Sequence, residues 1–260
     1  MDFESRLEAL KQHEADDTLI QELLSVQEEA FTANDAESYL KCTHWLFDLY
    51  VQLGETDQAT SLFLELVESP PFESYKTNFA IIDKLINLLL KTEDFQALKT
   101  VLFIRERYLP SHPEQRLMQS FYLAVCYEGL KDYPKAIQTL EAITDTISNS
   151  NLVSKYLKLA MLFIKTHQLQ NAKAAYDHAA IFDKKKKNDM FYLVASDIAY
   201  AEERYQDALR EFEAFFLKTK VKTRYLDRYL WICIQLEKWT EAWDFYKTYL
   251  PKINQTIDVD

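Results

Sequence analysis

Small and apolar residues recur along this chain in a repeated pattern. Residues 129–140 read GLKDYPKAIQTL and residues 201–212 read AEERYQDALREF; in both, an aromatic residue precedes an alanine by three positions, and another apolar residue follows four positions later. Aligning the chain on the alanine places an anchor at six positions: Ala59, Leu98, Ala136, Ala172, Ala208 and Ala242. Successive anchors are 39, 38, 36, 36 and 34 residues apart, so the pattern predicts a repeat that fills most of the chain.

The apolar positions within each repeat unit have helical spacing. A large residue follows each anchor by four positions, and in the first unit Tyr50 and Leu46 precede Ala59 by nine and thirteen. Residues four positions apart, such as Leu46 and Tyr50, share a helical face, because the helix turns every 3.6 residues. Each unit is therefore predicted to be a helix, a short turn and a second helix. Since one such pair cannot bury its own apolar face, the units must stack around a continuous core.

These residues make the chain similar to the tetratricopeptide repeat family, whose pattern combines leucine and tyrosine in the first helix with alanine, phenylalanine and a closing proline in the second. The first unit, LFDLYVQLGETDQATSLFLELVESPP, has Gly54 in its turn and Pro71 at its end, and Pro110 closes the second. Leu98 in place of alanine, and spacings above 34 residues in all but the last gap, indicate a divergent form. The resemblance, which spans roughly residues 36–250, implies an all-α, right-handed α-solenoid of about six helical hairpins.

An additional helical pair is predicted before the repeats. Residues 2–33 have apolar residues at helical spacing, and Asp17 is the expected N-cap of the second helix. This acidic pair would be the polar cap that stacked repeats need. We therefore expect one continuous structural domain with an N-terminal helical cap at 1–35, the solenoid at 36–252 and a C-terminal tail at 253–260.

The second helix of the sixth unit has no later repeat in this sequence to cover it. Its apolar residues Ala242, Tyr246 and Tyr249 would then be exposed. Three interpretations are open: Tyr246 and Tyr249 form the face of a homodimer, a further domain follows in the natural protein, or the end of the helix frays.

Composition and charge exclude several classes of protein. Only two glycines are present, too few for a dinucleotide-binding fingerprint or a phosphate loop. The net charge is −11, most of it within residues 1–40, and such a chain repels a nucleic-acid backbone. The run Lys184–Lys187 is expected to be a solvated loop.

Neither a signal peptide nor an apolar run long enough to span a membrane is apparent in the sequence. Cys42, Cys126 and Cys233 have no paired spacing and are expected to be reduced, buried thiols. These features predict a cytoplasmic protein with no membrane insertion and no direct binding of nucleic acid.

Catalytic and metal-binding motifs are missing from the sequence. The five histidines form no metal-ligand spacing, and no nucleophile elbow is present. We therefore expect no enzyme activity, no metal and no cofactor.

The resemblance to tetratricopeptide repeats implies a peptide-binding groove lined by the first helix of each unit. Carried onto this chain, the lining has aromatic side chains for contact area and basic side chains that could hold carboxylates. The expected groove residues are His44, Trp45, Asp48, Lys84, Asn87, Lys91, Tyr122, Lys158, Met161, Lys165, Asp197, Tyr200, Arg228 and Trp231, with Asp83, Phe121 and Asp227 beside them. For Trp45, Phe121 and Trp231, packing between helices is the alternative.

The function predicted from this lining is binding of a protein or peptide without catalysis. The architecture resembles the helical-repeat regions of bacterial signalling proteins, which precede an output domain such as a diguanylate cyclase or a transcription regulator. The alternatives are a self-contained peptide-pheromone receptor and a structural scaffold in a multiprotein complex. Lys84 and Asn87 have suitable positions for a chaperone carboxylate clamp, but the matching residues of neighbouring units are missing, which argues against one.

Overall fold

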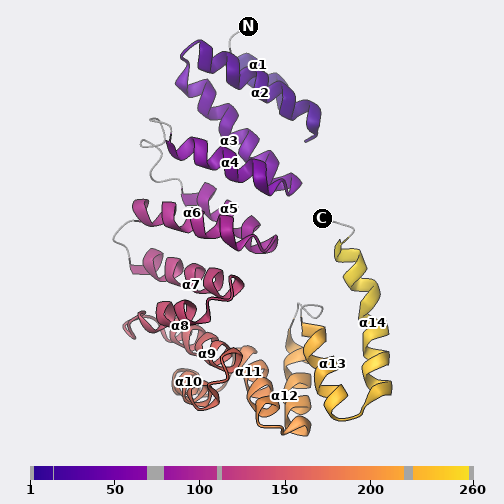
Figure 1. The fold of residues 1–260 in the computed structure, drawn as a ribbon. Helices are drawn as coiled ribbons and strands as arrows, with labels where there is room; N and C mark the ends of the chain where they lie inside the picture. Colours follow the sequence, from indigo (N-terminus) through magenta and orange to yellow (C-terminus); the bar gives the residue numbers. More distant parts are fainter. Residues whose placement is uncertain (1–2, 14, 69–78, 110–112, 220–224, 258–260) are drawn as a thin grey trace. The chain divides into compact units, whose positions relative to one another are not determined.

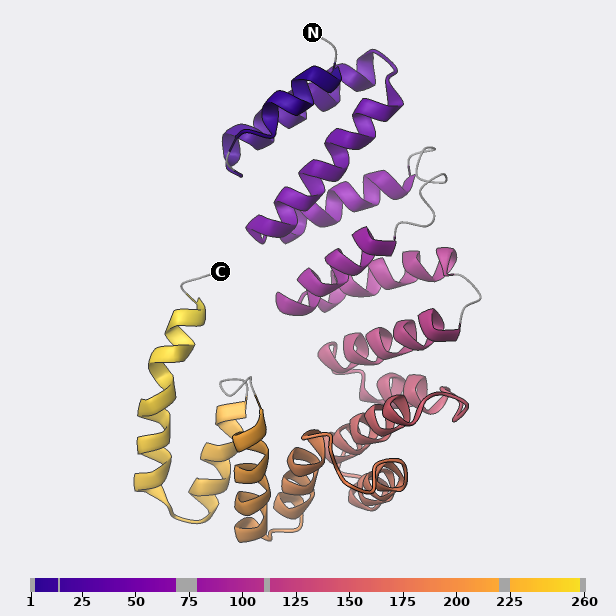
Figure 2. The same ribbon diagram turned by 180° about the vertical axis from the view of Figure 1, so that it is seen from behind.

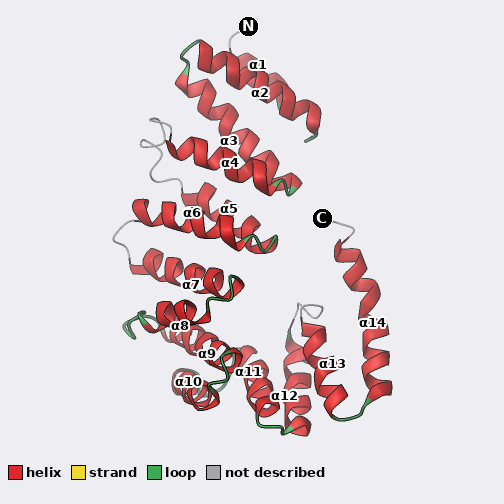
Figure 3. Cartoon of the chain, in the orientation of Figure 1, coloured by secondary structure: helices red, strands yellow, loops and turns green. Residues whose placement is uncertain are grey.

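The chain is helical throughout the part that the structure describes. The computed structural model of the 260-residue chain describes residues 3–13, 15–68, 79–109, 113–219 and 225–257. Every regular element in these ranges is a helix, and none is a strand (Figure 3). The predicted all-α fold is confirmed. Pro71 and Pro110, the closing prolines expected for the first two units, lie outside the described residues.

The helices divide between two compact parts of the chain, residues 1–119 and 120–260. The N-terminal part contains α1 (Phe3–Leu10), α2 (Asp17–Thr32), α3 (Ala36–Leu53), α4 (Thr56–Glu68), α5 (Phe79–Lys91), α6 (Phe95–Tyr108) and the start of α7 (Pro113–Gly129). The C-terminal part contains the rest of α7, α8 (Tyr133–Glu141), α9 (Asn149–Lys165), α10 (Leu169–Phe182), α11 (Met190–Ala201), α12 (Tyr205–Lys218), α13 (Leu226–Gln235) and α14 (Trp239–Ile257).

Six predicted hairpins correspond to the pairs α3/α4, α5/α6, α7/α8, α9/α10, α11/α12 and α13/α14 (Figures 1 and 2). Helix α9 packs against both its partner α10 and the next first helix, α11, and α3 likewise packs against both α4 and α5. First helices of neighbouring units therefore touch within each part of the chain, which is the arrangement expected for stacked repeats.

The six anchors lie in the core. Ala59, Leu98, Ala136, Ala172 and Ala208 are fully buried, and Ala242 is 8% exposed. Four of the large residues four positions later are fully buried as well, namely Phe63, Leu102, Leu140 and Phe212. The small anchor side chains therefore occupy the helix contacts, and the periodicity that predicted the repeats reflects this core.

Most turns inside the hairpins place a non-glycine residue in the left-handed region. Gly54 (φ 76°) ends α3, as the sequence predicts. The equivalent turns of the next five hairpins use residues with a side chain: Glu93 (φ 59°), Lys131 (60°), His167 (58°), Glu203 (60°) and Glu237 (56°). This backbone conformation costs an L-residue about 1–2 kcal/mol. A chain with two glycines thus makes these turns by accepting local strain, which the packing of the helices offsets.

The N-terminal helical pair is present as α1 and α2. The side chain of Asp16 caps α2, because its carboxylate accepts a hydrogen bond of 3.0 Å from the backbone N–H of Leu19. The prediction of Asp17 as the cap is wrong by one residue, because Asp17 is the first residue inside the helix. The cap must have a non-helical backbone for its side chain to reach the free amides of the first turn, and Asp16 has that backbone (φ −139°, ψ 178°).

A fully buried arginine joins three helices of the N-terminal part. Arg105 of α6 donates hydrogen bonds to Oε1 of Gln119 (3.0 Å) and of Gln115 (2.9 Å), both on α7. Its Nε lies 3.5 Å from Oδ1 of Asp83 on α5. Gln119 also donates from its amide to the carbonyl of Leu102 (2.8 Å). This polar cluster fixes α7 against α6, and nothing in the helical periodicity predicts it.

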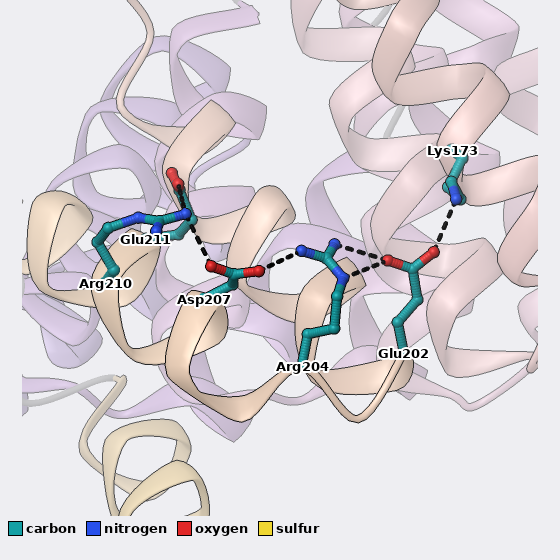
Figure 4. Close-up of polar contacts among 6 residues, drawn as sticks. All are labelled: Lys173, Glu202, Arg204, Asp207, Arg210 and Glu211. Carbon is teal, nitrogen blue, oxygen red and sulfur yellow. Dashed lines mark hydrogen bonds and ion pairs between the residues drawn. The ribbon is translucent and has the colours of Figure 1, made fainter.

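A chain of alternating charges links the α11–α12 turn to α10 (Figure 4). Lys173 of α10 binds Glu202 (2.7 Å), and Arg204 bridges Glu202 and Asp207 with contacts of 2.6 Å on each side. Arg210 continues the chain from Asp207 (3.0 Å). Hydrogen bonds from Lys173 and Arg204 hold the pKa of Glu202 below its ordinary value. Since these side chains are all at least partly exposed, each pair adds little stability by itself.

Candidate functional site

The predicted groove residues of the first repeat unit lie under the N-terminal helix. His44, Trp45 and Asp48 of α3 line a hollow of about 410 Å³ together with Lys41, with Glu4, Leu7 and Glu8 of α1, and with Lys11 directly after α1. Burial lowers the pKa of His44. Helix α1 therefore approaches the same face of α3 that the resemblance assigns to the ligand, a contact that the sequence did not predict.

An ion pair joins the groove residues of the first two units. Lys84 of α5 donates to Oδ1 of Asp48 at 2.6 Å, and both side chains are about half exposed. Asn87 and Lys91, on the same helix, are exposed. The structure thus brings Asp48 and Lys84 together across neighbouring first helices.

The C-terminal part repeats this kind of pairing with a residue that the sequence interpretation missed. Glu128 of α7 accepts hydrogen bonds from both predicted lysines of α9, Lys158 and Lys165, the latter at 2.7 Å. Burial acts to raise the pKa of Glu128, but the charges and hydrogen bonds of the two lysines outweigh it and hold the pKa below its ordinary value. In the repeat alignment Tyr127 and Ala199 are equivalent, so Glu128 occupies the position of Tyr200, a predicted groove residue. Its position in the repeat could therefore have identified it.

The remaining predicted residues of α7 and α9 are half-buried. They are Phe121, Tyr122 and Met161. None of them is sealed inside the core, so each keeps some surface on which a partner could pack.

A second hollow among the predicted residues lies between α11 and α13. Asp197, Tyr200, Arg228, Trp231 and Ile232 enclose about 390 Å³, and all but Ile232 were predicted. Arg228 is hydrogen-bonded and ion-paired to Asp197. The indole of Trp231 is 58% exposed, so packing in the core is not its role here.

Burial dominates the electrostatics of this hollow. It raises the pKa of Asp197 to about 6, although the charge and hydrogen bond of Arg228 act in the opposite direction. The neighbouring carboxylate of Asp227 adds to the rise, and Lys165 opposes it. A carboxylate that is hard to ionise and an arginine held beside it form a polar end to an otherwise largely apolar hollow.

Helix α14 divides its aromatic residues between core and surface. Tyr249 packs edge-on against Phe216 (5.4 Å between ring centres), and Tyr246 stacks on Trp243 (5.9 Å). Trp239 and Trp243 are 59% and 58% exposed. The exposed aromatic surface of α14 therefore centres on the two tryptophans, and a homodimer through Tyr246 and Tyr249 stays a prediction.

The lysine run is more structured than a solvated loop. Lys184, Lys185 and Lys187 are exposed, as expected. Lys186 instead donates to the hydroxyl of Tyr176 (2.7 Å), and its ammonium lies 4.8 Å from the centre of that ring. One lysine of the four therefore anchors the α10–α11 connection.

The metal-ligating and thiol side chains of the described residues form neither a metal cluster nor a disulfide. No cluster of His, Cys, Asp and Glu suited to a metal occurs in the described ranges. None of the three cysteines forms a disulfide and all three are buried, as predicted, and burial raises the pKa of Cys42 to about 11. No helix within those ranges has the length and apolarity needed to cross a membrane.

Comparisons with known proteins agree with this architecture. Residues 120–146 match the model of the tetratricopeptide repeat. The crystal structure of BtubC (BKLC) from P. vanneervenii aligns with a TM-score of 0.50 and 13% identity, covering 82% of this chain and 92% of that one. TPR-like repeats described as those of a kinesin light chain from Podosopora anserina align with a TM-score of 0.45 and 21% identity, covering 70% of this chain and 95% of that one. No curated protein matches the chain.

These similarities concern fold. The matched residues 120–146 cover α8 and much of α7, the third predicted unit, and the likeness to BtubC extends the repeat architecture over most of the chain. The predicted α-solenoid fold class is thereby confirmed. Helical repeats of this type offer extended surfaces to other proteins, which suggests a protein-interaction module, and the fold is typically non-catalytic. The predicted resemblance of the chain to the tetratricopeptide repeat family, in a divergent form, is confirmed.

Proposed function

We propose that the chain is a non-catalytic module that binds a protein or peptide segment along its first helices. The observation that carries this proposal is the hollow between α11 and α13, where an exposed tryptophan lies beside a partly buried ion pair. Tryptophan and arginine are the residues that most often dominate binding energy in protein interfaces. Trp231 and Arg228 supply both at one place.

The ion pairs of the first helices support this function by fixing the lining before a partner arrives. Asp48–Lys84, Glu128–Lys165 and Asp197–Arg228 each join neighbouring first helices. Side chains that are already held pay less conformational entropy on binding. In the hollow, an apolar side chain of the partner would pack on Trp231 and Tyr200, while the free N–H groups of Arg228 would hydrogen-bond to its backbone or to a carboxylate.

The biological setting belongs to the same proposal. We favour a regulatory or sensory part of a cytoplasmic bacterial signalling protein, whose output domain would lie outside this chain. A peptide-pheromone receptor or a scaffold in a multiprotein complex would use the same binding surface. An in-frame output domain in the gene supports the first of the three, and a small peptide gene nearby supports the second.

A matched pair of tryptophans tests the binding surface. Peptides selected from a random displayed library on the 260-residue chain are measured against the parent, Trp231→Ala and Trp239→Ala by fluorescence polarisation. The two indoles have nearly equal exposure, 58% and 59%, so both substitutions remove a similar surface tryptophan. We expect a class of selected peptides whose binding Trp231→Ala weakens about tenfold or more, the range of an interface hot spot, and Trp239→Ala leaves unchanged. If no selected peptide behaves in this way, the proposal is wrong.

A further inference from the structure

The third repeat unit has an unusually short second helix. Helix α8 spans nine residues, whereas α10 and α12 span fourteen. The chain leaves α8 at Glu141 and reaches the next first helix, α9, only at Asn149. Non-helical residues therefore occupy the place where other units continue their second helix. Because α8 is short, a space is left between α8 and α10.

This space is a hollow of about 870 Å³. Its floor is apolar, with Leu159 and Phe163 of α9, Ile137 of α8 and Ala174 and Ala175 of α10. On α9 the apolar residues Leu159 and Phe163 point about 100–160° around the helix from Lys158, Met161 and Lys165, since each residue advances the helix by about 100°. The hollow is therefore separate from the groove of the first helices.

A buried lysine contacts the α8–α9 connection, which forms one wall of the hollow. The ammonium of Lys155, whose side chain is 5% exposed, donates to the carbonyl of Ile143 (2.6 Å) and to Oδ1 of Asp145 (2.9 Å). Tyr156 donates its hydroxyl to Oδ2 of the same carboxylate (2.9 Å), and its ring stacks on His178 of α10 (5.2 Å). These hydrogen bonds hold the α8–α9 connection against α9, so the wall of the hollow has a defined structure.

The charge left at the rim is acidic. The ammonium of Lys155 is already hydrogen-bonded to Asp145 and Ile143, so it would interact only weakly with a charged ligand. Asp145 is still 53% exposed, and Glu141 is exposed and forms no ion pair with any described residue. Hydrogen bonds from Lys155 and Tyr156 hold the pKa of Asp145 below its ordinary value. Two carboxylates therefore border an apolar floor.

We propose that this hollow is a second docking site, which takes a segment of a partner protein carrying a lysine or arginine next to apolar side chains. The apolar side chains enter between α8 and α10, and the basic group meets Glu141 and Asp145. Peptide grooves commonly combine an apolar trough with a charged rim in this way. The site lies beyond the first-helix groove and does not depend on it.

Two exposed positions allow the site to be blocked without disturbing the core. Ala174 is exposed and lines the hollow, so Ala174→Arg fills it; Glu141→Lys reverses the charge of its rim. Ala9→Arg, at an exposed position of α1, is the matched control. The probe is a library of random displayed peptides, selected on the intact chain and measured against each variant and against Trp231→Ala.

The proposal expects a class of peptides that contain lysine or arginine beside apolar residues. Ala174→Arg and Glu141→Lys should each weaken these peptides about tenfold, or about 1.4 kcal/mol, while Ala9→Arg and Trp231→Ala leave them unchanged. Added salt should weaken them further. If no selected peptide responds to Ala174→Arg, or if those that respond are acidic, the proposal is wrong. A dimer of the parent chain that Ala174→Arg dissociates would show that a second copy fills the hollow and would likewise overturn it. The response to Trp231→Ala reports separately on the first-helix groove.

Discussion

Replacing Arg105 by methionine tests the polar cluster that fixes α7 on α6. The guanidinium is 1% exposed and donates to the side chains of Gln119 and Gln115 at 3.0 and 2.9 Å. Methionine keeps most of the apolar stem of the side chain but removes both hydrogen bonds. It also leaves Oε1 of Gln119, a residue that is itself 3% exposed, without this donor.

The magnitude follows from these contacts. Hydrogen bonds to a charged group contribute about 1.5–3 kcal/mol each, and the cost of burying the guanidinium offsets part of that sum. The contact with Asp83 adds less, because that carboxylate is 41% exposed. We expect Arg105→Met to lower the free energy of unfolding by about 2–4 kcal/mol.

Urea unfolding followed by circular dichroism measures this loss, and hydrogen exchange of the α6 amides locates it. Arg116→Met is the control, because Arg116 is 58% exposed and lies 3.9 Å from Glu106; it should change stability by less than about 0.5 kcal/mol. If the two variants prove equally stable, the buried cluster does not hold α7, and the reasoning fails.

Three further outcomes are expected. Glu237→Gly should stabilise the chain by about 0.5–1 kcal/mol, because it relieves a left-handed residue at φ 56° and loses part of that gain to the entropy of glycine; a loss in urea unfolding would contradict this. Asp197 should titrate near pH 6 by carbon-detected NMR. The folded chain then holds this proton more tightly than the unfolded chain. As the pH rises from 3.8 to about 6, the free energy of unfolding of the parent should therefore fall relative to that of Asp197→Asn. A difference between the two that does not change with pH would refute the assignment. Cys42, with a pKa of about 11, and Cys233, whose pKa burial also raises, should react with a thiol reagent at pH 8 only after unfolding; reaction of either in the native state would contradict its burial.

The repeated core could be predicted from the sequence because it depends on local periodicity. Each anchor and its partner four residues later lie in one helix, so Ala136 and Leu140 identify their shared face without knowledge of the rest of the fold. Arg105 could not be assigned in this way. A charged residue in a helix is normally predicted to be solvent-exposed. The burial of Arg105 depends on its contacts with Gln115 and Gln119 of the next helix.

The candidate site was predictable only in part, for the same reason. Position within the repeat placed Asp197, Tyr200, Arg228 and Trp231 on two neighbouring first helices, and in the structure the four residues line one hollow. It did not reveal that α1 lies over Trp45, because α1 is outside the repeats. It also gave no sign of the hollow beside α8, which arises where that helix is shorter than its counterparts in the other units.

Photo-crosslinking of a selected peptide tests the central claim most directly. A peptide that depends on Trp231 is synthesised with a photoreactive group at each position in turn, irradiated on the intact chain and mapped by mass spectrometry. The account predicts cross-links on α11 and α13, at Tyr200, Arg228 or Trp231. Cross-links concentrated on the second helices α10 and α12, with none on α11 or α13, would contradict it.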